Sequence, residues 1–303
     1  MSDAPTLVLE HVTKKFGDFT AVDDLSVQVR RGRVFGLIGP NGAGKTTTIR
    51  MIVNITVPDS GRVALFGQPM STALQDRIGY LPEERGLYKR MKVGEQLRFF
   101  AELKDLRGKE ADTRIDYWLA KLELKDWKEK RTKELSKGMQ QKVQFITSVI
   151  HDPDLLILDE PFSGLDPVNV EIMKDTILEL KQANKTIILS THQMEIAEKL
   201  CDDVCMINRS RKVLDGTLRD IRRSFSRNAV ALRFEGDDGL LRDSELVANV
   251  IPVGDEVEVL LAPGVSHQTL LKRLIDSQIV LTKFELVEPR LHEIFIEKVK
   301  ETA

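Results

Sequence analysis

Short apolar runs and amphipathic stretches alternate along the first two thirds of the chain. Continuous apolar runs occur at residues 33–38, 154–160 and 186–190, and such runs are typical of strands that are buried on both faces of a parallel sheet. An amphipathic stretch at about residues 170–183 predicts a helix between the last two strands, and another helix is expected at residues 46–54. Strands that alternate with helices in this way predict an α/β fold with a parallel-sheet core.

Two further regions interrupt this alternation. Near the N-terminus, short strands are expected at residues 7–12, 25–29 and 62–66, separated by turns, and we interpret them as an antiparallel β subdomain. Residues 92–135 are charged and helical in pattern, and no strand signal occurs among them. We therefore expect a helical insertion at about residues 92–140 within the α/β body.

The composition changes after Gly216, where a small C-terminal α/β domain is expected. Its strands are predicted at residues 229–234, 256–261 and 280–286, and its helices at residues 218–226, 268–275 and 291–300. We find no catalytic cluster in its sequence. The chain is thus predicted to form two domains, residues 1–218 and residues 219–303.

The first helix of that second domain is basic. It carries Arg219, Arg222 and Arg223, with Arg227 just beyond. These arginines lack the aromatic interleaving of nucleic-acid-binding segments, so we favour a solvated helix face and expect no nucleic-acid partner.

Composition indicates a soluble intracellular protein. The 303 residues are 42% hydrophobic and 30% charged, with a net charge of −2. No apolar run approaches the ~20 residues of a membrane-spanning helix, and residues 1–5 lack the features of a signal peptide. Cys201 and Cys205 are too few for a disulfide framework. We expect buried free thiols rather than a metal site, because no His or second Cys pair is nearby.

A glycine-rich loop follows the apolar run at residues 33–38. It fits the spacing G-x-x-x-x-G-K-[ST] of a phosphate-binding loop and comprises Gly39, Pro40, Asn41, Gly42, Ala43, Gly44, Lys45, Thr46 and Thr47. Glycines allow successive backbone N–H groups to point at an anion, and the following helix directs its positive dipole end to the same place. Lys45 is expected on the β/γ-phosphates of a nucleotide and the Thr46 hydroxyl on Mg²⁺. A simple glycine-rich turn is the alternative, which the flanking strand and helix disfavour.

Two acids end the run at residues 154–160. They lie at the C-terminal end of a predicted buried strand, where α/β sheets bind their ligands. Asp159 is expected to hold Mg²⁺, and Glu160 to activate or orient the attacking water. The alternative is an exposed acid pair that merely ends a strand.

Further motifs make about residues 7–216 resemble an ATP-binding cassette (ABC) ATPase. Residues 135–141, Leu-Ser-Lys-Gly-Met-Gln-Gln, resemble the family signature that begins Leu-Ser-Gly-Gly-Gln, and residues 161–166 match the loop after the acid pair. His192 matches the switch histidine of the family. Phe16 lies where the family stacks an aromatic ring on adenine, and Val22 where it adds an apolar contact. The order of these motifs is more specific than any one of them.

The resemblance implies that ATP is bound between two chains. The phosphate loop of each chain would face the signature of the other, which comprises Ser136, Lys137, Gly138 and Met139. Asp166 would belong to the D-loop, and His192 would contact the γ-phosphate and the region of the catalytic Glu160. The residues alone leave plainer roles open: Ser136 as a helix N-cap, His192 as a structural histidine and Phe16 as a core residue.

Two positions depart from the family pattern. Glu83 stands where the family usually has Gln. A carboxylate can still bind Mg²⁺, so Glu83 joins Thr46 and Asp159 as an expected ligand, although its charge beside the phosphates could alter magnesium dependence or turnover. In the signature, Lys137 replaces Gly and Met139 replaces Gln, and we expect Lys137 to point to solvent. Neither change removes an indispensable group, so activity is expected to be retained.

Within the family, we expect the ATPase motor of a transporter. The chain has no sustained heptads and only one phosphate loop, unlike the DNA-repair and translation-factor branches. A soluble ABC ATPase with another role and a nucleotide-dependent regulatory module are the alternatives. Residues 81–88 and 288–296 resemble sodium-efflux (NatA-type) exporter cassettes, which work with a separate ABC-2-type permease.

This resemblance also implies the partners. They are a second copy of the chain or a paralogous cassette, and a permease that holds the protein at the cytoplasmic face of the membrane. Export is the favoured direction, and the cargo stays open. For the C-terminal domain we hypothesise a role in dimerisation or regulation.

Overall fold

The computed structural model describes residues 4–84, 86–225, 228–236, 239–277 and 279–301. Arg85, Ser226 and Arg227, which belong to predicted segments, lie outside this part. Contacts divide the chain into two compact units, Met1–Leu218 and Arg219–Ala303, and each is described by itself. In the described residues, no helix has the length and apolar character needed to cross a bilayer.

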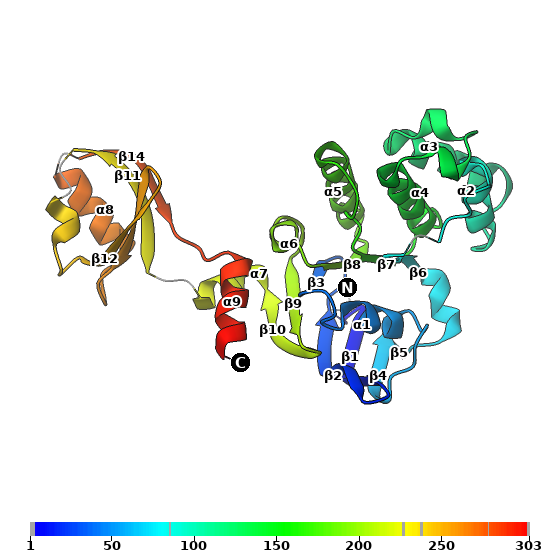
Figure 1. Ribbon diagram of the computed structural model, residues 1–303, viewed down its shortest axis with the longest axis horizontal. Coiled ribbons are helices and arrows are strands. Elements are labelled where there is room, and N and C mark those ends of the chain that lie inside the picture. The colour runs from blue at the N-terminus through cyan, green and yellow to red at the C-terminus, as the bar shows by residue number, and fades with distance from the viewer. Residues whose placement is uncertain (1–3, 85, 226–227, 237–238, 278, 302–303) are drawn as a thin grey trace. The chain divides into compact units, whose positions relative to one another are not determined.

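A six-stranded sheet forms the centre of the first unit (Figure 1). Its order is β10 (Arg211–Thr217), β9 (Asp203–Asn208), β3 (Val34–Ile38), β8 (Thr186–Thr191), β7 (Leu155–Asp159) and β6 (Ile78–Leu81). All neighbours are parallel except β10 and β9. Every residue of β3, β7 and β8 is buried, which explains their continuous apolar runs, and the predicted parallel α/β core is confirmed.

The edge strand β6 was not expected, because Gly79 lies in its middle. A Cβ on Gly79 would lie 1.9 Å from the carbonyl oxygen of Ser148. Glycine therefore allows the helix that contains Ser148 to pack directly on the strand.

A four-stranded antiparallel sheet lies beside the central one, in the order β2 (Phe19–Val29), β1 (Leu7–Phe16), β4 (Ser60–Leu65) and β5 (Gln68–Pro69). β1 and β2 are longer than predicted and contain register shifts that let them bend. Helix α1 (Lys45–Ile52) contributes Ile49, Met51 and Ile52 to a core shared with strands of both sheets. This packing fixes the start of α1 at the end of β3.

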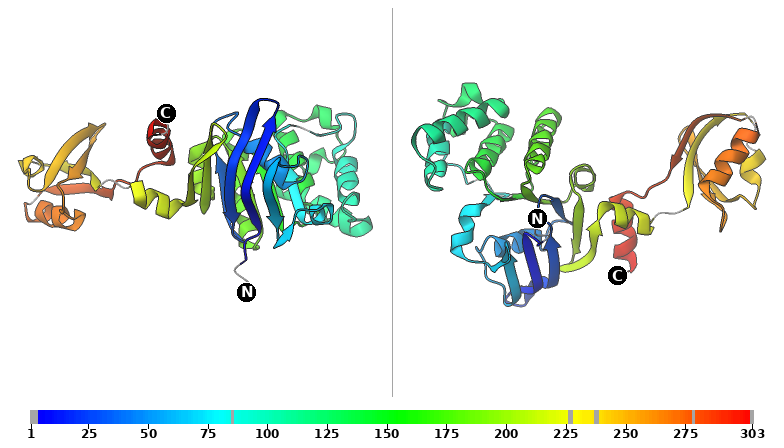
Figure 2. Two further views of the ribbon diagram at one scale, coloured as in Figure 1. Left: turned by 90° about the horizontal axis from the view of Figure 1, so that it is seen from below. Right: turned by 180° about the vertical axis from the view of Figure 1, so that it is seen from behind.

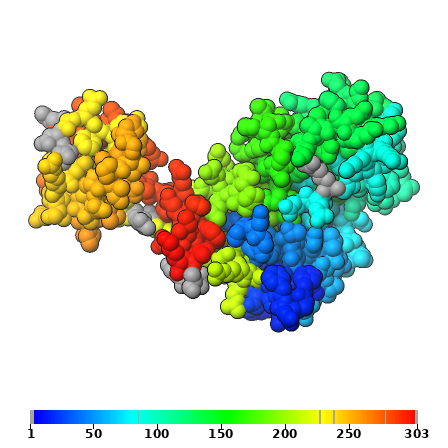
Figure 3. Space-filling model, viewed as in Figure 1, coloured from blue at the N-terminus to red at the C-terminus, as the bar shows by residue number. Residues whose placement is uncertain are grey.

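Helices form the rest of the first unit. The insertion contains α2 (Val93–Glu102), α3 (Gly108–Lys121) and α4 (Lys137–Val149), which form a distinct lobe in the space-filling view (Figure 3). The predicted limit near residue 140 falls inside α4, which continues through Val149 and packs on β6. Helices α5 (Pro167–Gln182) and α6 (Met194–Leu200) follow β7 and β8.

The second unit contains a four-stranded antiparallel sheet with one helix on a face (Figure 2). The sheet order is β12 (Val247–Val253), β13 (Glu256–Leu261), β11 (Ala229–Glu235) and β14 (Val280–Leu286), and the helices are α7 (Leu218–Phe225), α8 (His267–Asp276) and α9 (Leu291–Glu301). Leu270 and Leu274 of α8 are fully buried against Val230, Leu232 and Val259. This separate core explains how α8 is held to the sheet.

Candidate active site

A pocket of about 370 Å³ lies where the ends of β3 and β7 meet the start of α1. Its walls come from four segments distant in sequence and comprise Phe19, Ala21, Asn41, Gly42, Gly44, Lys45, Thr46, Thr47, Glu83, Asp159 and Glu160. The structure thus brings the predicted phosphate loop, the acid pair and Glu83 together around one cavity.

The phosphate loop needs glycine at two of its positions. Gly44, with φ of 110°, directly precedes α1, and a Cβ there would lie 2.4 Å from the carbonyl oxygen of Ala21. A Cβ on Gly39 would lie 2.1 Å from the carbonyl oxygen of Ile207. Among the described residues, no side chain caps the start of α1, so its first N–H groups and its dipole can face a phosphate group.

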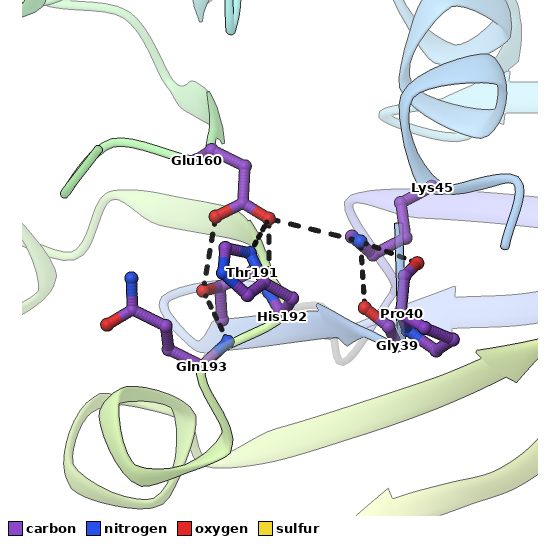
Figure 4. A network of polar contacts seen from close by, with 7 residues as sticks. All are labelled: Gly39, Pro40, Lys45, Glu160, Thr191, His192 and Gln193. Atoms are coloured by element: carbon purple, nitrogen blue, oxygen red, sulfur yellow. Dashed lines mark hydrogen bonds and ion pairs between the residues drawn. The ribbon is translucent and has the colours of Figure 1, made fainter. Parts of the chain in front are cut away.

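Lys45 is buried at the floor of this pocket. Its ammonium donates hydrogen bonds to the carbonyl oxygens of Gly39 at 2.8 Å and Pro40 at 3.1 Å, and it lies 3.9 Å from Oε1 of Glu160 (Figure 4). Burial lowers the pKa of Lys45, although the charges of Glu160, Asp159 and Glu83 oppose this shift. The loop therefore holds a cation beside its own backbone N–H groups, a suitable arrangement for phosphate oxygens.

Asp159 ends β7 with its carboxylate fully buried. Neither oxygen has a hydrogen bond of normal geometry within the described residues. The hydroxyls of Ser190 and Thr46 are close enough to lower its pKa, but burial raises it more, and the net shift is upward. A buried carboxylate with unused acceptor oxygens fits a bound cation or its water ligands.

The other oxygen donors of a magnesium site lie around the same pocket. The walls include Thr46 and Glu83 as well as Asp159. Across the described ranges, no group of three His, Cys, Asp or Glu side chains forms a complete metal site. The residues present fit a Mg²⁺ ion that takes its remaining ligands from phosphate oxygens and water.

Glu160 follows Asp159 in a left-handed backbone conformation, with φ of 49°. Its amide donates to the carbonyl oxygen of Ser190 at 3.0 Å. Its Oε1 accepts from the backbone N–H of His192 at 3.0 Å and lies 2.8 Å from Nδ1 of His192, while Oε2 accepts from Thr191 Oγ1 at 3.4 Å (Figure 4). Glu160 is thus oriented toward the pocket by the last two residues of β8 and by His192, which follows them.

The predicted adenine contacts, Phe16 and Val22, are not among the residues that line the pocket. Phe16 is 54% exposed and does not line the pocket, whereas Phe19, its partner across the hairpin, is 60% exposed and does. Val22 is buried in the core behind Gly44, and Ala21 lines the pocket instead. Phe19 and Ala21 line the pocket and were not predicted to do so, while the adenine contact of Phe16 stays a prediction.

The signature residues do not line the pocket of their own chain. Ser136 is an exposed N-cap, and its Oγ accepts from the N–H of Met139 at 3.2 Å. Lys137 is exposed, as expected, while Gly138 is buried against Gly164 and Leu165.

Asp166, the predicted D-loop residue, is likewise outside the pocket. It caps α5 by accepting from the backbone N–H of Asn169 at 3.0 Å, and it also accepts from the side-chain amide of Asn169. These two hydrogen bonds lower the pKa of Asp166. A nucleotide in this pocket therefore contacts only one of the two predicted sets of residues.

Comparisons with known proteins agree with this geometry. The profile of the family described as "ABC transporter" matches residues 22–163, and the profile described as "ATP-binding protein DrrA1-3-like, C-terminal domain" matches residues 216–299. A third profile, of an AAA domain, matches residues 131–198.

Individual proteins are also similar over most of the chain. The uncharacterized ABC transporter ATP-binding protein YhaQ of Bacillus subtilis (strain 168) is 43% identical over 97% of this chain and 98% of its own length. The Nod factor export ATP-binding protein I of Cupriavidus metallidurans is 36% identical over 84% of this chain and 78% of its own length. A solved structure described as the ATP binding subunit of an ABC transporter is 32% identical and superposes with a TM-score of 0.68, covering 73% of this chain and 93% of that one.

Proposed function

The chain belongs to the ABC transporter family as an ATP-binding subunit that hydrolyses ATP, and from this premise we propose that it drives an ABC-2-type export permease. Proteins of this family dimerise and work with membrane permeases. The observation that carries the proposal is the incomplete pocket, because Ser136 and Gly138 lie outside the cavity that holds Lys45 and Glu160. Two copies, or this chain and a paralogous cassette, would complete two sites by closing on two ATP molecules.

Export and the permease type rest on two further findings. The C-terminal unit matches the DrrA-like domain profile, and a relative similar over most of the chain is described as a Nod factor export protein. Through the permease, the protein would act at the cytoplasmic face of the membrane. A purely regulatory role is less consistent with the intact pair of Glu160 and His192. A soluble ABC ATPase with another role would keep the same pair and is the alternative that the permease test excludes.

Each pocket residue has a role in this proposal. The loop at residues 39–47 and Lys45 bind the phosphates, and Phe19 and Phe16 offer aromatic surface near the base. Thr46, Asp159 and Glu83 would hold Mg²⁺, which neutralises charge on the phosphate oxygens when it is bound. Glu160 orients or deprotonates the attacking water, and His192 holds the Glu160 carboxylate.

An aromatic cluster marks the surface where we place the permease. The rings of Tyr88, Phe99 and Phe100 contact one another, with centroids 5.5–6.3 Å apart. Tyr88 is 51% and Phe99 37% exposed. The backbone N–H of Tyr88 donates to Gln96 Oε1 at 2.6 Å, which joins the segment after Glu83 to α2. Exposed aromatic side chains next to the Glu83 loop, which lines the nucleotide pocket, would suit the docking of a helix of the permease.

A purification from membranes tests this proposal. We expect the wild-type chain to co-purify with a multi-spanning ABC-2-type permease that mass spectrometry identifies. Replacing Tyr88 and Phe99 by Ala should reduce recovery at least about tenfold, because each buried aromatic anchor contributes roughly 2 kcal/mol or more. Tyr117→Ala, an exposed aromatic on α3, is the matched control and should retain the permease. Recovery of the wild-type chain without a permease would contradict the transporter role.

Removing the second unit tests the hypothesis that it supports dimerisation or regulation. A chain truncated after Leu218 retains the whole nucleotide pocket. We expect ATP-dependent dimerisation, measured by light scattering, to weaken by about fivefold or more, a usual size for coupling between sites. Thermal unfolding would establish that the first unit stays folded. Unchanged dimerisation, ATPase rate and transport would exclude the hypothesis.

A further inference from the structure

Helix α4 carries two buried glutamines that bind the backbone of the loops around the active site. Gln144 Nε2 donates to the carbonyl oxygens of Pro82 at 3.1 Å and Glu84 at 3.0 Å. Gln141 Nε2 donates to the carbonyl oxygen of Pro161, the residue after Glu160, at 3.1 Å. Both side chains are at most 3% exposed. Helix α4 therefore makes hydrogen bonds to the segment around Glu83 and to the segment that follows Glu160.

The two hydrogen bonds of Gln144 enclose Glu83. Because their acceptors are the carbonyls before and after this residue, the peptide segment of Glu83 is held on both sides. Both N–H groups of the amide are used, and only the Nε2 side can face two carbonyl oxygens, so the orientation of the amide is determined. The Glu83 side chain itself is exposed and lines the pocket.

The helix that carries Gln144 is a fixed support. At Gly79 the chain leaves no room for a Cβ, so α4 lies directly on β6. His151, just after the helix, adds a contact of 3.1 Å between its Nε2 and the carbonyl oxygen of Ile78. The hydrogen bonds of Gln144 thus anchor the Glu83 loop to a helix that is packed on the central sheet.

We infer that Gln144 is a positioning residue for ATP hydrolysis, which holds the Glu83 carboxylate in place beside Asp159 and Thr46. The same helix begins at Ser136, the residue that the proposed function places against the nucleotide of a second chain. Helix α4 therefore connects the Glu83 loop of one nucleotide site to the signature residue of the other site, and this extension rests on the proposed function.

Hydrogen exchange in the nucleotide-free protein gives the first test. Gln144→Met keeps the length of the side chain but removes both donors, and Gln144→Glu additionally places a carboxylate against two carbonyl oxygens. We expect faster amide exchange in the segment around residues 82–88 for both variants, and more so for Glu. Gln75→Met, which removes a similar bond to the carbonyl oxygen of Val53, is the matched control and should leave this segment unchanged. Wild-type exchange in both Gln144 variants would overturn the inference.

Magnesium dependence gives the second test. In Gln144→Met, we expect the Mg²⁺ concentration for half-maximal ATPase rate to rise roughly fivefold to thirtyfold, the effect of 1–2 kcal/mol. In a Glu83→Ala background, the same substitution should change it by less than about twofold, because coupled residues do not add. Equal effects in both backgrounds would show that Gln144 does not act through Glu83. These constants do not depend on the permease, so loss of co-purification alone would refute the transporter role and leave this inference standing.

Discussion

Glu160→Gln is expected to lower the ATPase rate by roughly 10²–10⁴-fold, the range for loss of a general base. The substitution keeps the size of the side chain and an oxygen that can accept from the N–H of His192. It removes the negative charge that attracts a proton from the attacking water. ATP should still bind, so the variant should accumulate as an ATP-bound dimer. Phosphate release and size-exclusion chromatography with light scattering would measure both effects.

Glu179→Gln provides a matched control, because Glu179 is paired with Lys121 on the surface of α5 and α3, outside the pocket. Its rate should stay close to that of the wild-type chain. If Glu160→Gln hydrolysed ATP at the wild-type rate, Glu160 would not be the catalytic carboxylate. A slow variant that bound no ATP would instead indicate that Glu160 supports the structure of the pocket.

Lys45→Ala is expected to weaken ATP binding by about tenfold to 100-fold, since a hydrogen bond to a charged group contributes roughly 1.5–3 kcal/mol. In the structure, the Lys45 ammonium already lies against the carbonyl oxygens of Gly39 and Pro40. Phosphate oxygens would supply it with stronger, charge-assisted partners. Equilibrium binding of a fluorescent ATP analogue would measure the change.

Lys142→Ala is the matched control that distinguishes a loss of ATP affinity from a loss of folding stability. Lys142 is also buried and donates to a carbonyl oxygen, that of Leu122 at 2.8 Å, but it lies outside the pocket. Both variants should lower the melting temperature, and only Lys45→Ala should lower the affinity for ATP. Unchanged binding in Lys45→Ala would contradict the assignment of the phosphate loop.

The phosphate loop and the acid pair could be predicted because their information is local. The spacing of Gly39, Gly44 and Lys45 is set by one turn between a strand and a helix, and β7 is apolar throughout because both of its faces are buried. Membership of the ABC family could also be predicted, because its motifs are short local segments in a fixed order. A relative that matches nearly the whole chain confirms this prediction.

Features that depend on distant contacts could not be predicted in this way. The pairing of β1 with β2 brings Phe19 to the wall of the pocket, and no local pattern marks this residue. Gln144 bonds to carbonyls about sixty residues earlier in the chain, so no local pattern marks it. Strand β9 was not predicted either, although five of its six residues are buried and its apolar residues are consecutive in the sequence.

The left-handed backbone of Glu160 has a consequence for engineering. A non-glycine residue at such a φ stores about 1–3 kcal/mol of strain, which glycine would relieve while deleting the carboxylate. Glycine would also lose the hydrogen bonds that the Glu160 carboxylate accepts from the N–H of His192 and from Thr191 Oγ1, and this loss opposes the relief of strain. A laboratory screen for turnover would therefore keep the carboxylate whatever its net effect on heat resistance, because a glycine variant would bind ATP without hydrolysing it.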